Sequence, residues 1–219
     1  MKNLSLLLKL ASAGLLLLTF VIMILNHTQW LSDYVLSIGK SHFVYHIDVQ
    51  TVLAVIRYLL IIFFFVALSI DKTNDKRMLF ASGTGIQGVV FSVAYIPLYI
   101  ICALRSSDIE FESSYNAVSV VDFVMTILAV ICSVLGLLLM YKFLSQKDNM
   151  LPLVIAICAE GVIEILVWSV LMGMIPCMYE YIELISIFFN FAWGLLYALL
   201  MFQYSRNIDK YLLQESAQI

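Results

Sequence analysis

Two glutamates, Glu160 and Glu164, lie four residues apart in a stretch of otherwise apolar residues, and Arg57 interrupts a second apolar stretch. Residues four apart share one face of an α-helix, so both carboxylates would project in the same direction. Two carboxylates that lie close together in a medium of low dielectric do not both ionise readily, unless a cation lies between them. Ionisable groups in such apolar segments are typical of proton relays and of sites for ions or small polar solutes.

The position of each polar residue within its apolar segment predicts its depth, at about 1.5 Å per helical residue. Arg57, Glu164 and Asn190 each fall roughly 10 Å below the outer edge of a hydrocarbon core about 30 Å thick. Glu160 falls about one turn deeper, near the level of Gln87. Asp122 falls at the outer surface. Together these residues form a predicted polar ladder from the outer surface to the middle of the bilayer, which consists of Asp122, Arg57, Glu164, Asn190, Glu160 and Gln87.

Three interpretations of these charges remain open from the sequence. Arg57 and Glu164 form a buried pair that only fixes helix packing, or the polar ladder binds or relays a proton, cation or small polar solute. Alternatively, the helix boundaries are misassigned or the charges pair with another subunit. Since one arginine needs one carboxylate partner, the second glutamate, Glu160, favours a functional site.

A glycine-rich motif, Gly83-Thr84-Gly85-Ile86-Gln87-Gly88, has the GxGxxG spacing of dinucleotide-binding loops. That loop requires a preceding strand and a βαβ unit, whereas this motif opens an apolar helix, so we reject nucleotide binding. Small residues recur every four positions there, at Thr84, Gly88 and Ser92. Small residues at this spacing let two helices approach closely, and we predict a packing role for them.

Histidines and cysteines give only weak signals. His42 and His46 have a spacing that could present two ring nitrogens to a metal ion on a helix, but no HExxH motif or nearby cysteine supports this. We therefore expect solvated loop histidines, and no metal site or cofactor. Cys102 and Cys177 both fall near the predicted outer face, but spacing alone does not establish a disulfide.

Composition defines the elements that must position these residues. Hydrophobic residues make up 63% of the 219 positions, while charged residues make up 12%, about half the usual fraction of a soluble domain. A surface this apolar excludes a soluble globular enzyme and a nucleic-acid-binding protein with a basic stripe. We predict an all-α, polytopic integral membrane protein.

The apolar segments predict a bundle of six transmembrane helices in a single transmembrane domain over residues 1–219. The predicted spans cover about 4–25, 49–70, 78–104, 117–141, 151–175 and 182–204. Helical spacing of apolar residues over about 29–39 predicts a short amphipathic helix at the outer interface. A short tail after the last span, with Tyr211 on its apolar face, is predicted to lie on the membrane surface. We expect the first span to be an uncleaved anchor.

Basic residues fall on one set of helix ends. Nine lie at the ends that include both termini: Lys2, Lys9, Lys72, Lys76, Arg77, Lys142, Lys147, Arg206 and Lys210. Only Lys40 and Arg105 lie at the opposite ends. The positive-inside rule therefore predicts cytoplasmic N and C termini. We expect the membrane to be the cytoplasmic (plasma) membrane of the cell.

No catalytic motif accompanies this layout: GxSxG, HExxH and the P-loop are all absent, so we do not expect an enzyme. We predict a small transporter or channel-like module that moves or binds a proton, cation or small polar solute at the intramembrane Arg/Glu site. The alternative is a non-transporting membrane module, such as a sensor, immunity or assembly factor, or accessory subunit. Expected partners are the lipid bilayer, the solute, and another membrane subunit or a second copy of the chain, but not nucleic acid.

Overall fold

A computed structural model describes the backbone of residues 2–27, 36–38, 45–47, 49–72, 74–105, 111–144, 147, 149–174 and 179–217. Side chains are described for most of these residues, except near the helix ends at the side of the bundle where a short strand pair lies.

Six helices and one short strand pair make up the described chain. In order they are α1 (Lys2–His27), β1 (Leu36–Ile38), β2 (Tyr45–Ile47), α2 (Val49–Ile70), α3 (Lys76–Arg105), α4 (Phe111–Leu144), α5 (Leu151–Met174) and α6 (Tyr179–Ala217). The predicted helical class with six helices is thus confirmed. Four of the helices contain candidate spans, Lys2–Leu25, Val52–Ile70, Val124–Leu144 and Ile187–Ser216, which are long and apolar enough to cross a membrane.

The predicted interfacial helix over 29–39 is wrong at its C-terminal end. Leu36–Ile38 is a strand that pairs antiparallel with Tyr45–Ile47, with Leu36 opposite Ile47. Both segments alternate an apolar and a polar residue and carry β-branched or aromatic side chains, which favour strands. A short apolar pattern does not distinguish a helix from a strand. Residues 29–35 lie outside the described part of the chain.

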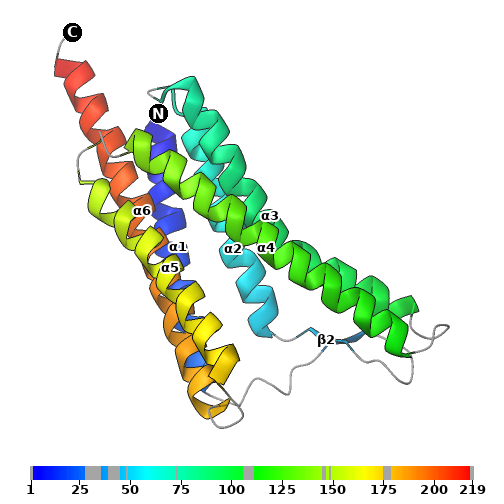
Figure 1. Cartoon of the computed structure of the whole chain (residues 1–219). Helices are drawn as coiled ribbons and strands as arrows, with labels where there is room; N and C mark the ends of the chain where they lie inside the picture. Colours follow the sequence, from blue (N-terminus) through cyan, green and yellow to red (C-terminus); the bar gives the residue numbers. More distant parts are fainter. Residues whose placement is uncertain are drawn as a thin grey trace.

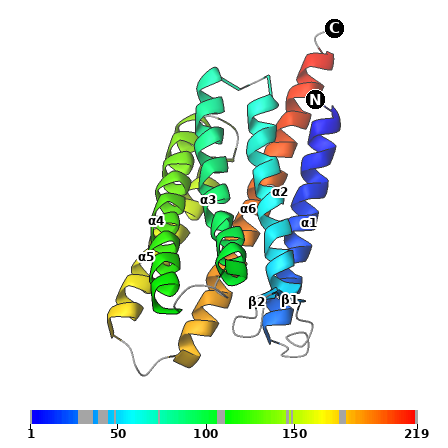
Figure 2. The same ribbon diagram turned by 90° about the vertical axis from the view of Figure 1, so that its right-hand side faces the viewer.

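Both termini lie at one end of the bundle, together with the α2–α3 turn and the α4–α5 connection (Figure 1). The strand pair, the C-terminal end of α5 and the N-terminal end of α6 lie at the opposite end (Figures 1 and 2). Asp75 starts α3 as an N-cap, since its Oδ1 accepts a 3.2 Å hydrogen bond from the amide of Arg77. Before α5, Asn149 takes a positive φ of 58°, a conformation that asparagine tolerates better than most residues.

Helices α1 and α6 pack side by side and antiparallel (Figure 2). Buried positions alternate by three and four residues along both helices, which is the spacing of a heptad seam. The seam consists of Ser5, Leu8, Ser12, Leu15, Thr19 and Ile22 on α1, and Gly194, Ala198, Met201, Ser205 and Ile208 on α6. Ser5 Oγ donates to the carbonyl of Ser205 over 3.1 Å, and Ser12 Oγ donates to that of Ala198 over 2.7 Å.

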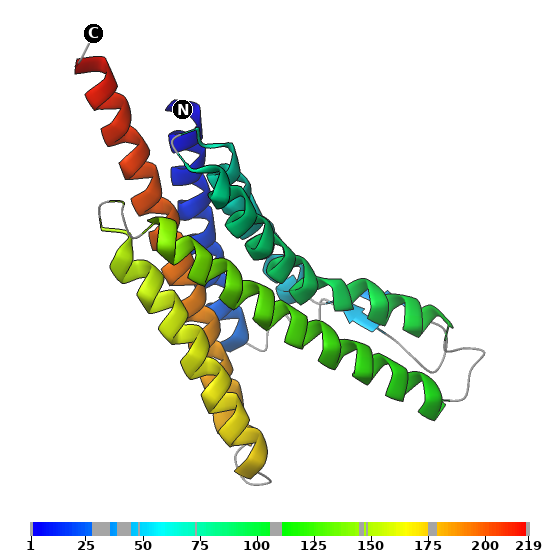
Figure 3. The same cartoon turned by 45° about the horizontal axis from the view of Figure 1, so that its top comes forward.

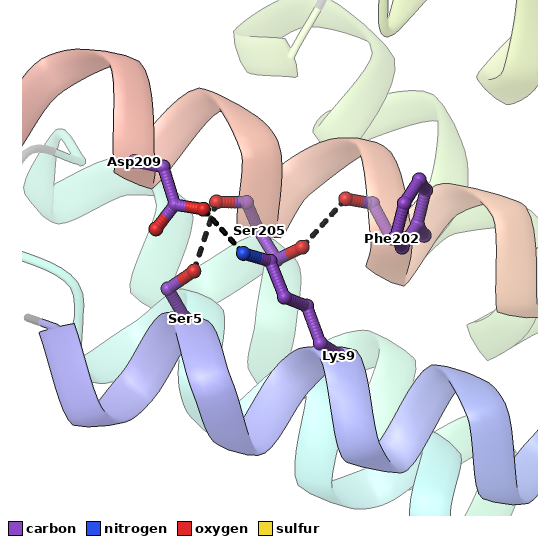
Figure 4. A network of polar contacts seen from close by, with 5 residues as sticks. All are labelled: Ser5, Lys9, Phe202, Ser205 and Asp209. Atoms are coloured by element: carbon purple, nitrogen blue, oxygen red, sulfur yellow. Dashed lines mark hydrogen bonds and ion pairs between the residues drawn. The ribbon is translucent and has the colours of Figure 1, made fainter.

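Helix α6 continues past the predicted span as one helix of 39 residues, so the expected separate surface tail is not observed. At about 1.5 Å per residue it is nearly twice as long as the hydrocarbon core is thick. Lys9 on α1 donates to Asp209 Oδ2 on this extension, in an ion pair of 2.5 Å (Figure 4). Because α1 packs along the extension, the helix does not bend away after the predicted end of the span.

Large apolar side chains divide into two groups. The core is concentrated towards the end of the bundle that carries the termini, with Phe64, Leu68, Met140 and Tyr204 fully buried. Others face outwards, including Leu17, which is 66% exposed. Apolar residues exposed this extensively are unusual on a water-soluble monomer but suit a surface in contact with lipid.

Candidate functional site

A cavity of about 330 Å³ lies between helices α2, α3, α4, α5 and α6. We call it the polar cavity, because four predicted site residues line it: Arg57, Glu160, Glu164 and Asn190. Helices α3 and α4 run side by side and diverge from α5 and α6 towards the end that carries the strand pair (Figures 1 and 3).

Arg57 is a buried charge of the polar cavity, and only 4% of it is exposed. Its Nη1 donates to the carbonyl oxygen of Asn190 over 3.3 Å, and its Nη2 donates to Asn190 Oδ1 over 3.0 Å. The guanidinium carbon also lies 5.0 Å from the ring centre of Trp193 and 5.6 Å from that of Tyr58. Cation–π contacts at these distances stabilise the charge and fix its position.

The two glutamates differ in their surroundings. Glu164 is half-buried and its charge interacts favourably with Arg57. Glu160 is 9% exposed, one turn away on the same face of α5, and its Oε1 has no hydrogen-bond partner among the described residues. Arg57 Nε is likewise buried without a partner there. Buried polar atoms are nearly always hydrogen-bonded in proteins, so two atoms without a partner among the described residues set this cavity apart from the packed core.

Aromatic side chains form one wall of the polar cavity, and the sequence did not single them out. Trp193 packs 5.6 Å from Tyr58 and 5.0 Å from Tyr197, between ring centres, and Tyr197 contacts Phe65 at 6.4 Å. Asn190, Trp193 and Tyr197 are spaced by three and four residues, so they share one face of α6. This spacing, read together with Asn190, is the signal that could have identified Trp193.

The other predicted polar residues lie elsewhere. Gln87 is exposed and does not line the polar cavity. Asp122 belongs to α4, but its side chain lies outside the described part of the structure, as do the side chains of His42 and His46. Among the described residues, no three His, Cys, Asp or Glu side chains lie close enough together to hold a metal ion.

The small residues of α3 lie along α4. A Cβ atom on Gly88 would lie 2.4 Å from Ser133 Oγ and 2.8 Å from the Ser133 backbone nitrogen. A Cβ atom on Gly136 would lie 2.8 Å from the backbone nitrogen of Gly85 and 3.2 Å from Thr84 Oγ1. Ser92, the third predicted packing residue, donates to the carbonyl of Gly88 over 2.9 Å and lines the polar cavity.

A second polar cluster, not predicted from the sequence, lies at the end of the bundle that carries the termini. We call it the inner polar network; it consists of Asp71, Asn74, Lys147 and Tyr204. Tyr204 donates its hydroxyl proton to Asp71 Oδ2, and Asn74 Nδ2 donates to the Tyr204 hydroxyl over 2.7 Å. Lys147 Nζ donates to Asn74 Oδ1 over 2.6 Å and lies 4.8 Å from the centre of the Tyr204 ring. Burial lowers the pKa of Lys147, and the negative charge of Asp71 partly offsets this effect.

These features define a helical membrane protein with a polar cavity in one half of the bundle and a bonded polar network in the other. Comparison of the chain with protein-family models, curated proteins and solved structures found no match.

Proposed function

We propose that this chain is a small transporter or channel-like module that binds a proton, cation or small polar solute in the polar cavity. The observation that carries the proposal is the pair of buried polar atoms without partners, Glu160 Oε1 and Arg57 Nε, beside a cavity of about 330 Å³. An Arg–Glu pair that served only to fix packing would need one carboxylate, and Glu164 supplies it. The packing of the helices then does not require Glu160. Because burying a charged group in a span costs free energy, such a residue is a candidate for a functional role.

We propose a six-span topology with both termini in the cytoplasm of a cell membrane. The arrangement of the helices supports it, since the ends that carry nine basic residues all lie at the end of the bundle with the termini (Figure 1). Positive charge on that side matches the usual distribution of basic residues on cytoplasmic loops. The polar cavity would then lie in the outer half of the membrane and the inner polar network near the cytoplasmic surface.

The separation of the polar cavity from the inner polar network along the helix axes also suits alternating access. Arg57 and Asn190 precede Asp71 and Tyr204 by fourteen residues on the same two chain segments, which is about 21 Å along a helix. A solute in the polar cavity would be separated from the cytoplasm by the inner polar network. Its release inwards would require the contacts around Tyr204 to open.

Flux measurements in proteoliposomes test this function. Glu160→Gln, Glu164→Gln and the double variant are compared with wild type for movement of protons, inorganic cations and small polar solutes. We expect wild type to conduct or exchange at least one of these, and the Glu160→Gln variants to lose that flux. Glu215→Gln is the matched control, because this exposed residue lies on the extension of α6, far along the helix from the cavity. Unaltered flux in all three folded cavity variants would refute the proposal.

A further inference from the structure

We infer that the polar cavity takes a small organic monocation with a primary ammonium group, held between the carboxylate of Glu160 and the aromatic wall. This inference rests on the proposed function and names the class of solute. It follows from the charge balance of the cavity, its size, its lining and the missing hydrogen-bond donor at Glu160.

Charge balance gives the sign and number of the solute's charge. Arg57 is bonded through two nitrogens to Asn190, and the carboxylate of Glu164 supplies a negative charge that favours its charged form. Glu160 adds a second carboxylate to a cavity that has only one basic residue in its lining. With both carboxylates ionised, the described lining carries one negative charge in excess. A bound monocation balances that charge and favours the ionised state of both carboxylates, whereas an anion does not.

Size and lining distinguish an organic cation from a bare ion or a proton. A cavity of about 330 Å³ is at the lower end of the range for small-molecule sites and is far larger than a single ion needs. Metal cations prefer a shell of several oxygen ligands. Most lining residues are apolar or aromatic instead, and the aromatic members are Tyr58, Phe65, Phe91, Phe189, Trp193 and Tyr197.

The aromatic wall already holds one cation. The guanidinium of Arg57 lies over Trp193, and rings of this kind attract organic cations through their negative faces. Tyr197 continues the wall from Trp193 to Phe65. An alkylammonium would place its charge at Glu160 and its carbon atoms against these rings.

The hydrogen bonds of the site favour a primary ammonium over a quaternary one. Glu160 Oε1 is buried and needs a donor, and no described residue supplies it. A primary ammonium has three N–H donors, whereas a tetraalkylammonium has none. A charge-assisted hydrogen bond of this kind is among the strongest non-covalent contacts that a small solute can make.

Thermal unfolding of the full-length protein in lipid nanodiscs tests this inference. The probes are ethylammonium, tetramethylammonium, sodium and glycine, each compared at equal ionic strength. A ligand that binds only the folded state raises the melting temperature in a saturable way. We expect ethylammonium to do so, with a half-saturating concentration about tenfold or more below that of each other probe.

Variants locate the bound probe. Glu160→Gln should raise the half-saturating concentration of ethylammonium about tenfold or more, while the exposed control Glu215→Gln should leave it unchanged. If Glu160→Gln does not fold, Glu160→Asp keeps the carboxylate but withdraws it by one methylene, and weaker binding is then expected. Equal binding of ethylammonium by wild type and by the Glu160 variant would overturn the inference.

The other outcomes separate the inference from the function on which it rests. Tighter binding of glycine, sodium or tetramethylammonium than of ethylammonium would overturn the ammonium assignment but leave a solute-binding cavity. Glu160-dependent proton flux without any effect of ethylammonium would do the same. If no probe changes the melting temperature and no flux depends on Glu160, both the inference and the proposed function fail.

Discussion

Two chain segments, those of α2 and α6, meet at polar groups twice, and the two meetings differ in how completely they are bonded. In the inner polar network, Tyr204 binds both Asp71 and Asn74, and Lys147 closes the group from the α4–α5 connection. In the polar cavity, Arg57 binds Asn190, yet Arg57 Nε and Glu160 Oε1 have no partner among the described residues. The first group has the bonding of a structural lock, and the second is the place where we propose that a solute binds.

The difference shows that a buried or half-buried charge does not by itself indicate function. Lys147 and Asp71 are charged, like the cavity residues. Their contacts join the α2–α3 and α4–α5 connections to α6. Among the described residues, no buried side-chain polar atom of the network lacks a hydrogen-bond partner. A fully bonded network rigidifies the end of a bundle. A partly bonded network leaves buried polar atoms without partners, which destabilises the fold unless a bound group forms hydrogen bonds with them. The predictions below test this distinction.

The largest expected effect is that of Arg57→Ala on the polar cavity. Removing the guanidinium leaves Glu164 without its favourable charge and Asn190 without two hydrogen bonds from a charged donor, each worth about 1.5 to 3 kcal/mol. We expect a large loss of folded protein, measured by thermal unfolding in nanodiscs. Changing Glu164→Ala as well should restore part of the loss, because the unmatched carboxylate is then gone.

The double variant is the sharper half of this test. If Arg57→Ala and the double variant are equally unstable, Glu164 is not the charge partner of Arg57, and the excess of one carboxylate at Glu160 would no longer follow. The charge argument for a monocation would then lose its basis.

The next largest effect is expected in the inner polar network, from Tyr204→Phe. This change removes the hydroxyl that donates to Asp71 and accepts from Asn74, and leaves buried polar groups unbonded at a cost of about 1 to 3 kcal/mol. Tyr211→Phe is the matched control, since Tyr211 is exposed on the same helix and its change should be nearly neutral. Equal stability of the two variants would show that the network does not lock the bundle.

How far the sequence predicted these two regions depends on the range of the contacts involved. Arg57, Glu160, Glu164 and Asn190 were identifiable because each is a polar residue in an apolar run, and depth along a helix follows from residue counting alone. The partner of each could not be predicted, because helix order in the bundle and rotation about each axis depend on long-range packing. Gln87 illustrates this: its depth is suitable, but it faces outwards.

The inner polar network escaped prediction for a different reason. Asp71, Asn74 and Lys147 lie in connections, where polar residues are expected and give no signal. Tyr204, at the end of a predicted span, has the pattern of an ordinary interfacial aromatic residue. Only the fold brings it beside two turns that are distant in sequence.

A third prediction concerns the close contact between α3 and α4 beside the polar cavity, and it uses a pair of glycine variants. Gly88→Ala would place a methyl group against Ser133 of α4, and overpacking of this kind typically costs about 1 to 3 kcal/mol. Gly161→Ala is the control, since no atom lies within 4 Å of its added Cβ. Because alanine favours helices over glycine by up to about 1 kcal/mol, the control should be neutral or slightly stabilising. If both variants are equally stable, α3 and α4 do not approach as closely as described.

A smaller effect is expected from the titration of Lys147. Burial lowers its pKa in the folded protein below the 10.5 of an exposed lysine. Between the lowered pKa and 10.5 the unfolded state binds more protons, so the contribution of Lys147 to stability rises as the pH rises through this window. Lys147→Met should remove that part of the pH dependence of the melting temperature. Lys72→Met, at an exposed position in the α2–α3 turn, is the control.

The sharpest contrast between the two regions is expected from replacing one carboxylate by an amide in each, and the change at Glu160 should alter stability least of all. Asp71→Asn weakens an acceptor that Tyr204 uses, and should cost about 1 to 3 kcal/mol. Glu160→Gln removes a buried charge whose Oε1 has no described partner, so the ligand-free protein should lose little stability or gain some. The same variant should abolish binding and flux, which an effect on folding alone would not do. If Glu160→Gln destabilises the ligand-free protein as much as Asp71→Asn does, Glu160 belongs to the packing of the bundle, and the distinction between a lock and a binding site fails at its most direct test.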